Sequence, residues 1–342
     1  MKKYILLIAV LAFLWSCKSN KTLSSAELTS NSKLITSYAN TINEADIKKH
    51  VFTLASDEFE GRRTGEKGQK MAAEYLANEY KSYGLKGNHL TGDYFQNVPL
   101  EALKNKSEHP SENVIGFIEG IEKPEEIVVI SSHYDHEGIK NGEIYNGADD
   151  NASGTSAVIE IAQAFSEAKK AGYGPKRSLL FINFTGEEKG LLGSAYYVSN
   201  STYPLENITA ALNIDMIGRI GKDKPGDTNY LYIIGADRLS SELHLINEDA
   251  NQKYSKLDLD YTYNAIDDKN RFYYRSDHYN FAKHNIPIIF YFNGVHEDYH
   301  KPTDTPDKIN IELLTRRARL IFYTAWELAN RENRIIVDKA DK

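Results

Sequence analysis

Short apolar segments that could be buried on both faces alternate along this chain with segments of helical periodicity. Strands buried on both sides need a layer of helices over each face of their sheet. The sequence therefore predicts a three-layer αβα sandwich with a mostly parallel, mixed central sheet. The expected strands are 113–119, 127–132, 178–185, 208–215, 230–234 and 287–292, and the expected helices are 45–55, 65–83, 153–168, 191–199, 239–254, 277–284 and 309–330.

These elements form one domain, expected to span residues 41–334 of the 342 and to be followed by a C-terminal tail at 335–342. Residues 17–40 are rich in Ser, Thr, Asn and Lys, which predicts a flexible tether leading into the domain. The formal charge of −7 argues against a nucleic-acid partner, which would require a basic surface. Nothing in the sequence indicates an obligate protein partner.

The N-terminus has the pattern of an export signal. Lys2 and Lys3 precede an apolar run at 5–15, which is too short to span a bilayer as a helix. Cys17, the only cysteine of the chain, follows this run in a context that resembles a bacterial lipobox. We expect residues 1–16 to be a lipoprotein signal peptide and a lipidated Cys17 to anchor the exported protein to a membrane, in the periplasm or at the outer membrane or cell surface. The alternative is a plain secretory signal with an incidental cysteine.

Polar residues gather where the expected strands end. Functional residues of parallel sheets collect at the carboxyl ends of strands. Histidine and carboxylate ligands without thiolates suit zinc or a similar divalent metal, and a carboxylate between two metals can bridge them. Each cluster alone is weak evidence, but their repeated position at strand ends predicts a metal site. The clusters are His133 with Asp135, Asp149 with Asp150, Glu187 with Glu188, Asp215, and a later loop with His296, Glu297, Asp298 and His300.

The order of these motifs resembles that of zinc exopeptidase family twenty-eight, which includes bacterial leucyl aminopeptidases and glutamate carboxypeptidase II. The resemblance begins at Gly61 and reaches the last helix, and it implies the zinc-peptidase form of the sandwich. The interval 95–113 is too short for the protease-associated insert of some members. The motifs are His133-Tyr134-Asp135, Gly-Ala-Asp-Asp-Asn-Ala-Ser-Gly at 147–154, Glu187-Glu188, Asp215-Met216, Ser276-Asp277-His278, and His300 followed by Asp304.

The resemblance implies two zinc ions per chain, with cobalt or manganese as possible substitutes. His133 and Asp215 would bind one ion, Glu188 and His300 the other, and Asp150 would bridge them. It also implies a cis peptide bond between Asp150 and its successor.

Other residues would act around the metals. Glu187 would be the general base that takes a proton from the attacking water and passes it to the leaving amine. Tyr273, or Tyr274 in its place, would donate to the developing oxyanion.

The resemblance also implies supporting groups. Asp135 would hydrogen-bond His133, and Asp304 would serve His300 in the same way. From its own position at the opening of an expected helix, Asp277 would cap that helix or brace the site. His136, His278 and His296 lie close to the motifs without an assigned role.

The expected activity is hydrolysis of peptide bonds by a metallo-exopeptidase, with peptides as substrates. Aminopeptidase is the commonest pattern on this scaffold and is the form we expect, while carboxypeptidase and dipeptidase activities stay open. Two alternatives come from other classes: a glutaminyl-cyclase-like zinc acyltransferase, and a catalytically inert binding module on the same fold.

Overall fold

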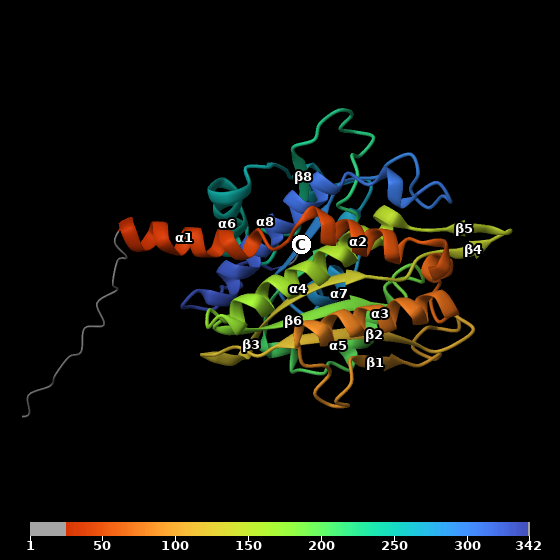
Figure 1. The fold of residues 1–342 in the computed structure, drawn as a ribbon, viewed down its shortest axis with the longest axis horizontal. Coiled ribbons are helices and arrows are strands. Elements are labelled where there is room, and N and C mark those ends of the chain that lie inside the picture. Colours follow the sequence, from red (N-terminus) through yellow and green to blue (C-terminus); the bar gives the residue numbers. More distant parts are fainter. Residues whose placement is uncertain (1–24, 341–342) are drawn as a thin grey trace, which may run out of the picture.

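A twisted sheet of eight strands runs through the centre of the computed structural model, which describes residues 25–340 (Figure 1). The strand order is β1-β2-β6-β3-β7-β10-β8-β9. Its central pairs, β6 with β3, β3 with β7 and β7 with β10, are parallel. The predicted mostly parallel, mixed sheet is therefore confirmed. The strands are β1 (Phe95–Val98), β2 (Ser111–Ile118), β3 (Lys123–His133), β6 (Arg177–Phe184), β7 (Ile208–Ile214), β8 (Tyr230–Ile234), β9 (Asp258–Asp260) and β10 (Ile288–Phe292). A separate hairpin pairs β4 (Gly138–Lys140) with β5 (Glu143–Tyr145).

Helices cover both faces of the sheet. One face carries α1 (Ser25–Ala39), α2 (Glu44–Leu54), α3 (Lys67–Tyr83), α4 (Gly154–Lys170), α6 (Ser241–Ala250) and α8 (Ile311–Asn330). The other carries the shorter α5 (Leu192–Ser199) and α7 (His278–Ala282). In Figure 1, α2, α3 and α4 lie in front of the strands.

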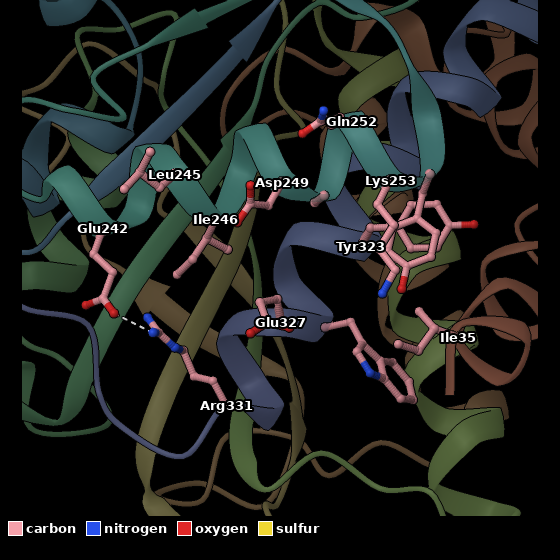
Figure 2. A pocket seen from close by; sticks show the side chains of 13 residues that line it. Ile35, Glu242, Leu245, Ile246, Asp249, Gln252, Lys253, Tyr323, Glu327 and Arg331 are labelled. Atoms are coloured by element: carbon pink, nitrogen blue, oxygen red, sulfur yellow. Dashed lines mark hydrogen bonds and ion pairs between the residues drawn. The ribbon is translucent and has the colours of Figure 1, made fainter. Parts of the chain in front are cut away.

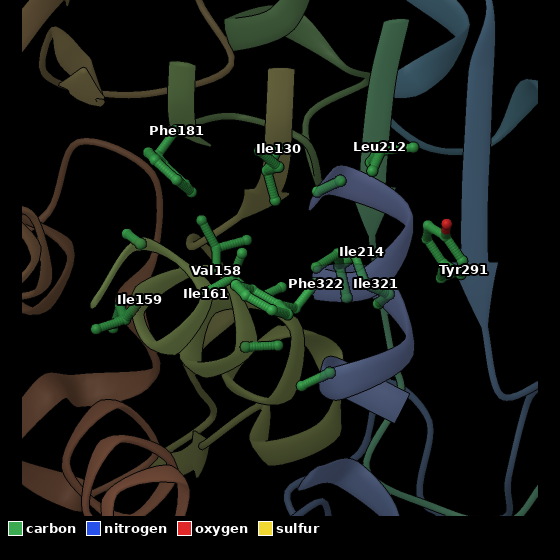
Figure 3. Close-up of a cluster of buried hydrophobic side chains, with 14 of the residues drawn as sticks. Ile130, Val158, Ile159, Ile161, Phe181, Leu212, Ile214, Tyr291, Ile321 and Phe322 are labelled. Carbon is green, nitrogen blue, oxygen red and sulfur yellow. The ribbon is translucent and has the colours of Figure 1, made fainter. Parts of the chain in front are cut away.

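The side chains of each central strand alternate between two hydrophobic cores, one on each face of the sheet. Ile130 and Phe181 face the core formed with α4 and α8 (Figure 3), whereas Val129 and Leu180 face the opposite core. Successive side chains of a strand point to opposite faces. The continuous apolar runs read from the sequence are therefore the ones that a doubly covered sheet requires.

Local capping fixes where several helices begin and end. The Asn43 side chain accepts hydrogen bonds from two amides of the first turn of α2, and Asn310 does the same for one amide of α8. Gly84, with a φ of 82°, ends α3 in the left-handed conformation that glycine adopts without a Cβ clash.

The tether prediction is wrong for residues 25–39, which form helix α1. Ile35 and Ala39 are buried in the core, and the Tyr38 ring stacks on Trp326 with centroids 6.1 Å apart. The apolar residues of this segment are few but lie at helical spacing, so packing against α8 compensates for a polar composition. The predicted signal peptide (1–16) and lipidated Cys17 lie outside the described residues. Within the described chain, no helix combines the length and the apolar character needed to cross a bilayer.

The C-terminal segment packs against the domain instead of leaving it at residue 334. Ile335 is buried, the Asp338 carboxylate accepts a hydrogen bond from the Ser241 amide at 2.8 Å, and the Lys339 amide donates to the Leu239 carbonyl at 3.2 Å. These bonds hold the segment beside the first turn of α6, so the predicted domain boundary is too early.

Candidate metal centre

Three neighbouring parallel strands deliver the predicted ligands to one edge of the sheet. His133 is the last residue of β3, Asp215 directly follows β7, and Glu187 and Glu188 follow β6. His133 lies opposite the last residue of β6 in the strand register. The edge rule for parallel sheets therefore places these side chains together.

Asp150 lies between two pairs of predicted ligands. Its Oδ1 is 3.2 Å from His133 Nε2, which is also 3.3 Å from Asp215 Oδ1. Its Oδ2 is 3.0 Å from His300 Nε2, which is also 3.3 Å from Glu188 Oε2. The structure thus brings all five predicted ligands together in the division that the sequence analysis proposed.

The predicted ligands differ in exposure. The His300 side chain is 35% exposed, while the side chains of His133 and Asp150 are 1% and 4% exposed.

The donor set fits a divalent cation. His133 Nε2, Glu188 Oε1 and Asp215 Oδ1 are buried and make no hydrogen bond within the described chain. Although burial acts to lower it, hydrogen bonds to Asp150 and Glu188 raise the pKa of His300 to about 10. Imidazole nitrogens with carboxylate oxygens are the donors that zinc takes.

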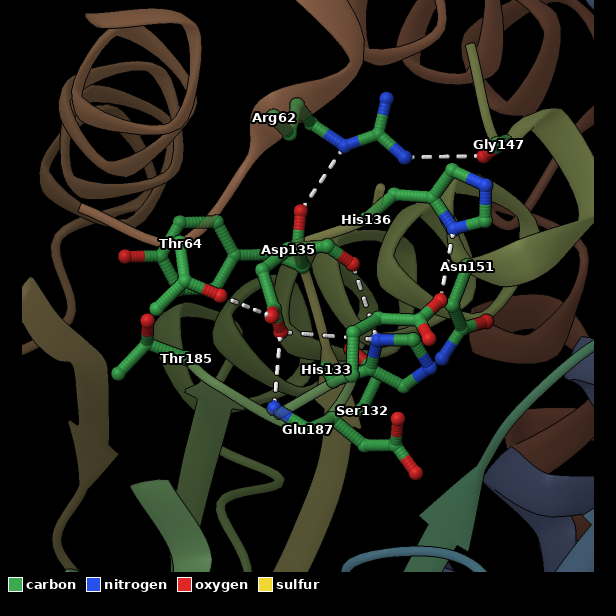
Figure 4. Close-up of polar contacts among 12 residues, drawn as sticks. Arg62, Thr64, Ser132, His133, Asp135, His136, Gly147, Asn151, Thr185 and Glu187 are labelled. Atoms are coloured by element: carbon green, nitrogen blue, oxygen red, sulfur yellow. Dashed lines mark hydrogen bonds and ion pairs between the residues drawn. The ribbon is translucent and has the colours of Figure 1, made fainter. Parts of the chain in front are cut away.

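The sequence analysis expected Asp135 to hydrogen-bond His133 as a side-chain partner. In the structure the contact is made by the Asp135 backbone carbonyl and not by its carboxylate. The Asp135 carbonyl is 3.1 Å from His133 Nδ1, whereas its carboxylate is 3.8 Å away. The carboxylate instead accepts hydrogen bonds from the Thr64 hydroxyl at 2.7 Å and the Glu187 amide at 3.1 Å (Figure 4). A proton on Nδ1 directed at a carbonyl leaves the Nε2 lone pair free to face the cluster.

Asp304 holds the bridging segment rather than His300, which corrects the predicted pairing. Its carboxylate accepts hydrogen bonds from the Asp149 and Asp150 amides at 3.0–3.1 Å. The carboxylate nearest His300 Nδ1 is that of Glu137, at 3.8 Å. The cis peptide bond expected between Asp150 and Asn151 is present.

Asp277 braces the region without capping α7 through its side chain. No hydrogen bond links its carboxylate to the first turn of α7, and the Ser194 hydroxyl donates to it at 2.5 Å. Burial raises the pKa of Asp277 to about 7. The helix-cap alternative is therefore wrong, and the bracing alternative describes the contact.

The predicted oxyanion donor does not line the cavity beside the cluster. Tyr273 is buried under the Arg238 guanidinium, 3.9 Å from its ring centroid, and neither it nor Tyr274 is among the described lining residues. Tyr299 does line the cavity, and its ring stacks on His300 with centroids 3.9 Å apart. The assignment of Tyr273 stays a prediction, and Tyr299 is a site residue that the sequence analysis missed.

Two cavities differ in size and in the residues that line them. The small one, about 30 Å³, is bordered by Asp150, Glu187 and Asp215. A larger one, about 590 Å³, lies between α6 and α8 and is lined by none of the predicted site residues (Figure 2). The carboxylates that border the small cavity therefore identify it as part of the candidate site, although the other cavity is larger.

His136 is a second missed residue. It is fully buried, and its Nδ1 lies 2.9 Å from Glu188 Oε1 and 3.9 Å from Asp150 Oδ2. The sequence did offer a signal for His136, because it directly follows the His133-x-Asp135 motif in the same loop at the end of β3.

Comparison with known proteins agrees with the architecture. A probable leucine aminopeptidase of Trichophyton verrucosum is 32% identical over 242 residues, which are 68% of this chain and 62% of that protein. The match thus spans less than two thirds of that relative's length. Two solved structures share the fold. A zinc aminopeptidase from Bacillus subtilis has a TM-score of 0.63 and 18% identity, covering 86% of this chain and 97% of that one. A glutaminyl cyclase from Porphyromonas gingivalis has a TM-score of 0.65 and 17% identity, covering 83% of this chain and 97% of that one.

The sequence profile of peptidase family M28 matches residues 113–325, which is more than half of the 342 residues. This segment includes every predicted metal ligand. The chain therefore belongs to peptidase family M28.

Proposed function

We propose that this protein is a zinc aminopeptidase with two metal ions per chain, which removes N-terminal residues from peptides. The observation that carries the proposal is the Asp150 carboxylate, whose two oxygens face two separate histidine–carboxylate pairs. The relatives named as leucine aminopeptidase and zinc aminopeptidase support the same activity.

The five ligands would hold the metals in two groups that share Asp150. His133 and Asp215 form one group, and Glu188 and His300 form the other. When bound, two zinc ions supply Lewis acidity toward the scissile carbonyl and make water a stronger nucleophile at neutral pH.

Glu187 would move the proton. It lies in a group with His133 and Asp215 whose candidate ligand atoms are all within 4.8 Å of one another. Burial, together with the nearby carboxylates of Glu188 and Asp215, raises the pKa of Glu187 well above its usual range. The Asp135 carboxylate fixes the Glu187 backbone through its amide. A carboxylate held in this way can accept a proton from water and return it to the leaving amine.

The site of action follows from the N-terminal pattern. We propose that lipidated Cys17 anchors the exported enzyme to a membrane and that its substrates are peptides outside the cytoplasm. Cys17→Ser should move the protein from the membrane fraction to the soluble fraction and abolish incorporation of labelled palmitate. Palmitate labelling of the serine variant would contradict this proposal.

One substrate panel tests the activity. Purified protein, with and without added zinc, is assayed with aminoacyl chromogenic substrates, with the same peptides carrying blocked N-termini, and with a glutaminyl peptide. The proposal predicts zinc-dependent cleavage of free N-termini only. Cleavage of blocked peptides would refute the aminopeptidase assignment, and cyclisation of the glutaminyl peptide without hydrolysis would favour the acyltransferase whose fold it shares.

A further inference from the structure

We propose that His136 is an additional metal ligand, which binds through Nδ1 the ion held by Glu188 and His300. This inference rests on the proposed two-metal function. It makes the two metal positions unequal, because one of them gains a second imidazole.

The distances suit shared coordination. Zinc–nitrogen and zinc–oxygen bonds are about 2.0–2.2 Å, so two donor atoms on one tetrahedral ion lie about 3.3–3.6 Å apart. His136 Nδ1 is 2.9 Å from Glu188 Oε1 and 3.9 Å from Asp150 Oδ2. His136, Asp150 and Glu188 also form a group whose candidate ligand atoms all lie within 4.8 Å of one another.

The contact is an ion pair, because His136 Nδ1 and Glu188 Oε1 are 2.9 Å apart. Both atoms and His136 Nε2 are buried, and none of the three has the geometry of a hydrogen bond within the described chain. One shared ion would bind both atoms of this pair.

The backbone and a glycine hold the His136 ring in place. The His136 amide donates to the Arg62 carbonyl at 3.1 Å. A Cβ added to Gly147 would lie 2.4 Å from His136 Cγ, so the ring packs directly against this glycine. Gly147 also has a φ of 56°, a conformation that favours glycine. The imidazole is therefore directed at the cluster before any metal binds.

The coordination would differ between the two positions. One ion would have three protein donors. The other would have four protein donors and bind more tightly. The three donors are His133, Asp150 and Asp215, and the four are His136, Asp150, Glu188 and His300.

The test compares metal affinities of the wild type, His136→Gln and a matched control. His50→Gln makes the same change at another buried histidine, whose ring contacts Tyr75 and Glu160 and none of the ligands. Zinc content is measured by mass spectrometry, and stepwise dissociation constants by competition with a chromophoric chelator. Replacing a group in the outer shell of a metal site costs about 10–100-fold in affinity. Loss of a direct ligand should therefore weaken one of the two ions by about 100-fold or more and leave the other nearly unchanged, with no such change in His50→Gln.

A measurement on the wild type does not depend on how the variant folds. X-ray absorption of the zinc-loaded protein counts imidazole nitrogens per zinc. Three histidines over two ions give an average of about 1.5, whereas two histidines give about 1.0.

The outcomes separate the two proposals. A wild type that binds no zinc would overturn the proposed function itself. A wild type that binds two zinc ions with about 1.0 imidazole per ion, or a His136→Gln variant with unchanged affinities, would overturn the role of His136 alone.

Discussion

Glu187→Gln separates proton transfer from metal binding. The substitution keeps the size of the side chain but removes its ability to accept a proton at neutral pH. The Glu187 backbone stays anchored, because its amide donates to the Asp135 carboxylate at 3.1 Å. The five predicted ligands are unchanged, so the fold and the donor set should persist.

The expected loss of kcat follows from the proposed role of Glu187 as a general base. General acid–base groups contribute about 10²–10⁴-fold to rate, which corresponds to about 2.7–5.4 kcal/mol of transition-state stabilisation. Burial and the carboxylates of Glu188 and Asp215 disfavour a charge on Glu187 in the metal-free protein, so an uncharged amide at this position should not destabilise it. We therefore expect kcat to fall by at least about 100-fold while the metal-free variant is as stable as the wild type or more so.

Steady-state kinetics on a leucyl chromogenic substrate, at saturating zinc and with the metal content of each sample measured, provides the assay. Glu188→Gln is the comparison, because its Oε2 lies 3.3 Å from His300 Nε2 and its loss should lower zinc occupancy instead. Full turnover by zinc-loaded Glu187→Gln would refute the mechanism. Equal loss of zinc in both variants would show that Glu187 binds metal and is not a separate base.

Three further predictions concern stability. Chelating the metals should lower the melting temperature, and zinc at about 1,000 times its dissociation constant should restore about 4 kcal/mol per site, as calorimetry can measure. Asp304→Asn should lower the free energy of unfolding by about 1.5–3 kcal/mol in urea titrations, because the Asp149 and Asp150 amides lose a charged acceptor; an unchanged midpoint would contradict this. Burial lowers the pKa of His278 to about 3, so its unfolded form takes up a proton below pH 6.5 and the folded form does not. Its stability contribution is complete above pH 6.5 and declines by about 2 kcal/mol between pH 7 and pH 5, and His278→Gln should show a correspondingly smaller decline.

The part of the site that lies at strand ends could be predicted from the sequence, because the carboxyl ends of parallel strands lie at the same edge of the sheet. Apolar runs located β3, β6 and β7, and the first polar residues after them had to meet at one edge. This rule brings His133, Glu187, Glu188 and Asp215 to one edge, but only the family resemblance distinguished the predicted ligand Glu188 from its neighbour Glu187. Asp150 and His300 come from loops, and only the motif order indicated that they join the same cluster.

The errors lie where irregular backbone decides which atom faces which. The Asp135 carboxylate and its carbonyl are both near His133, and only the turn after β3 determines that the carbonyl is the closer acceptor. Tyr299 was missed because Tyr273 lies in a three-residue 3₁₀ helix and Tyr299 in a loop, so spacing could not determine which ring borders the cavity. Helix α1 was missed for another reason: its stability comes from tertiary packing of a few apolar residues.

Arg62 shows how loops distant in sequence are held at the separation that the cluster needs. Its fully buried guanidinium donates to the carbonyls of Tyr134 at 2.9 Å, Asn146 at 2.8 Å and Gly147 at 2.9 Å. Tyr134 directly follows the predicted ligand His133, and Gly147 precedes the turn that carries Asp150. Burial lowers the pKa of Arg62 to about 10, so the group stays charged at neutral pH. A single planar cation therefore links the end of β3 to the bridging turn through charge-assisted hydrogen bonds, and its positive charge also compensates part of the carboxylate charge that the turn brings to the metal centre.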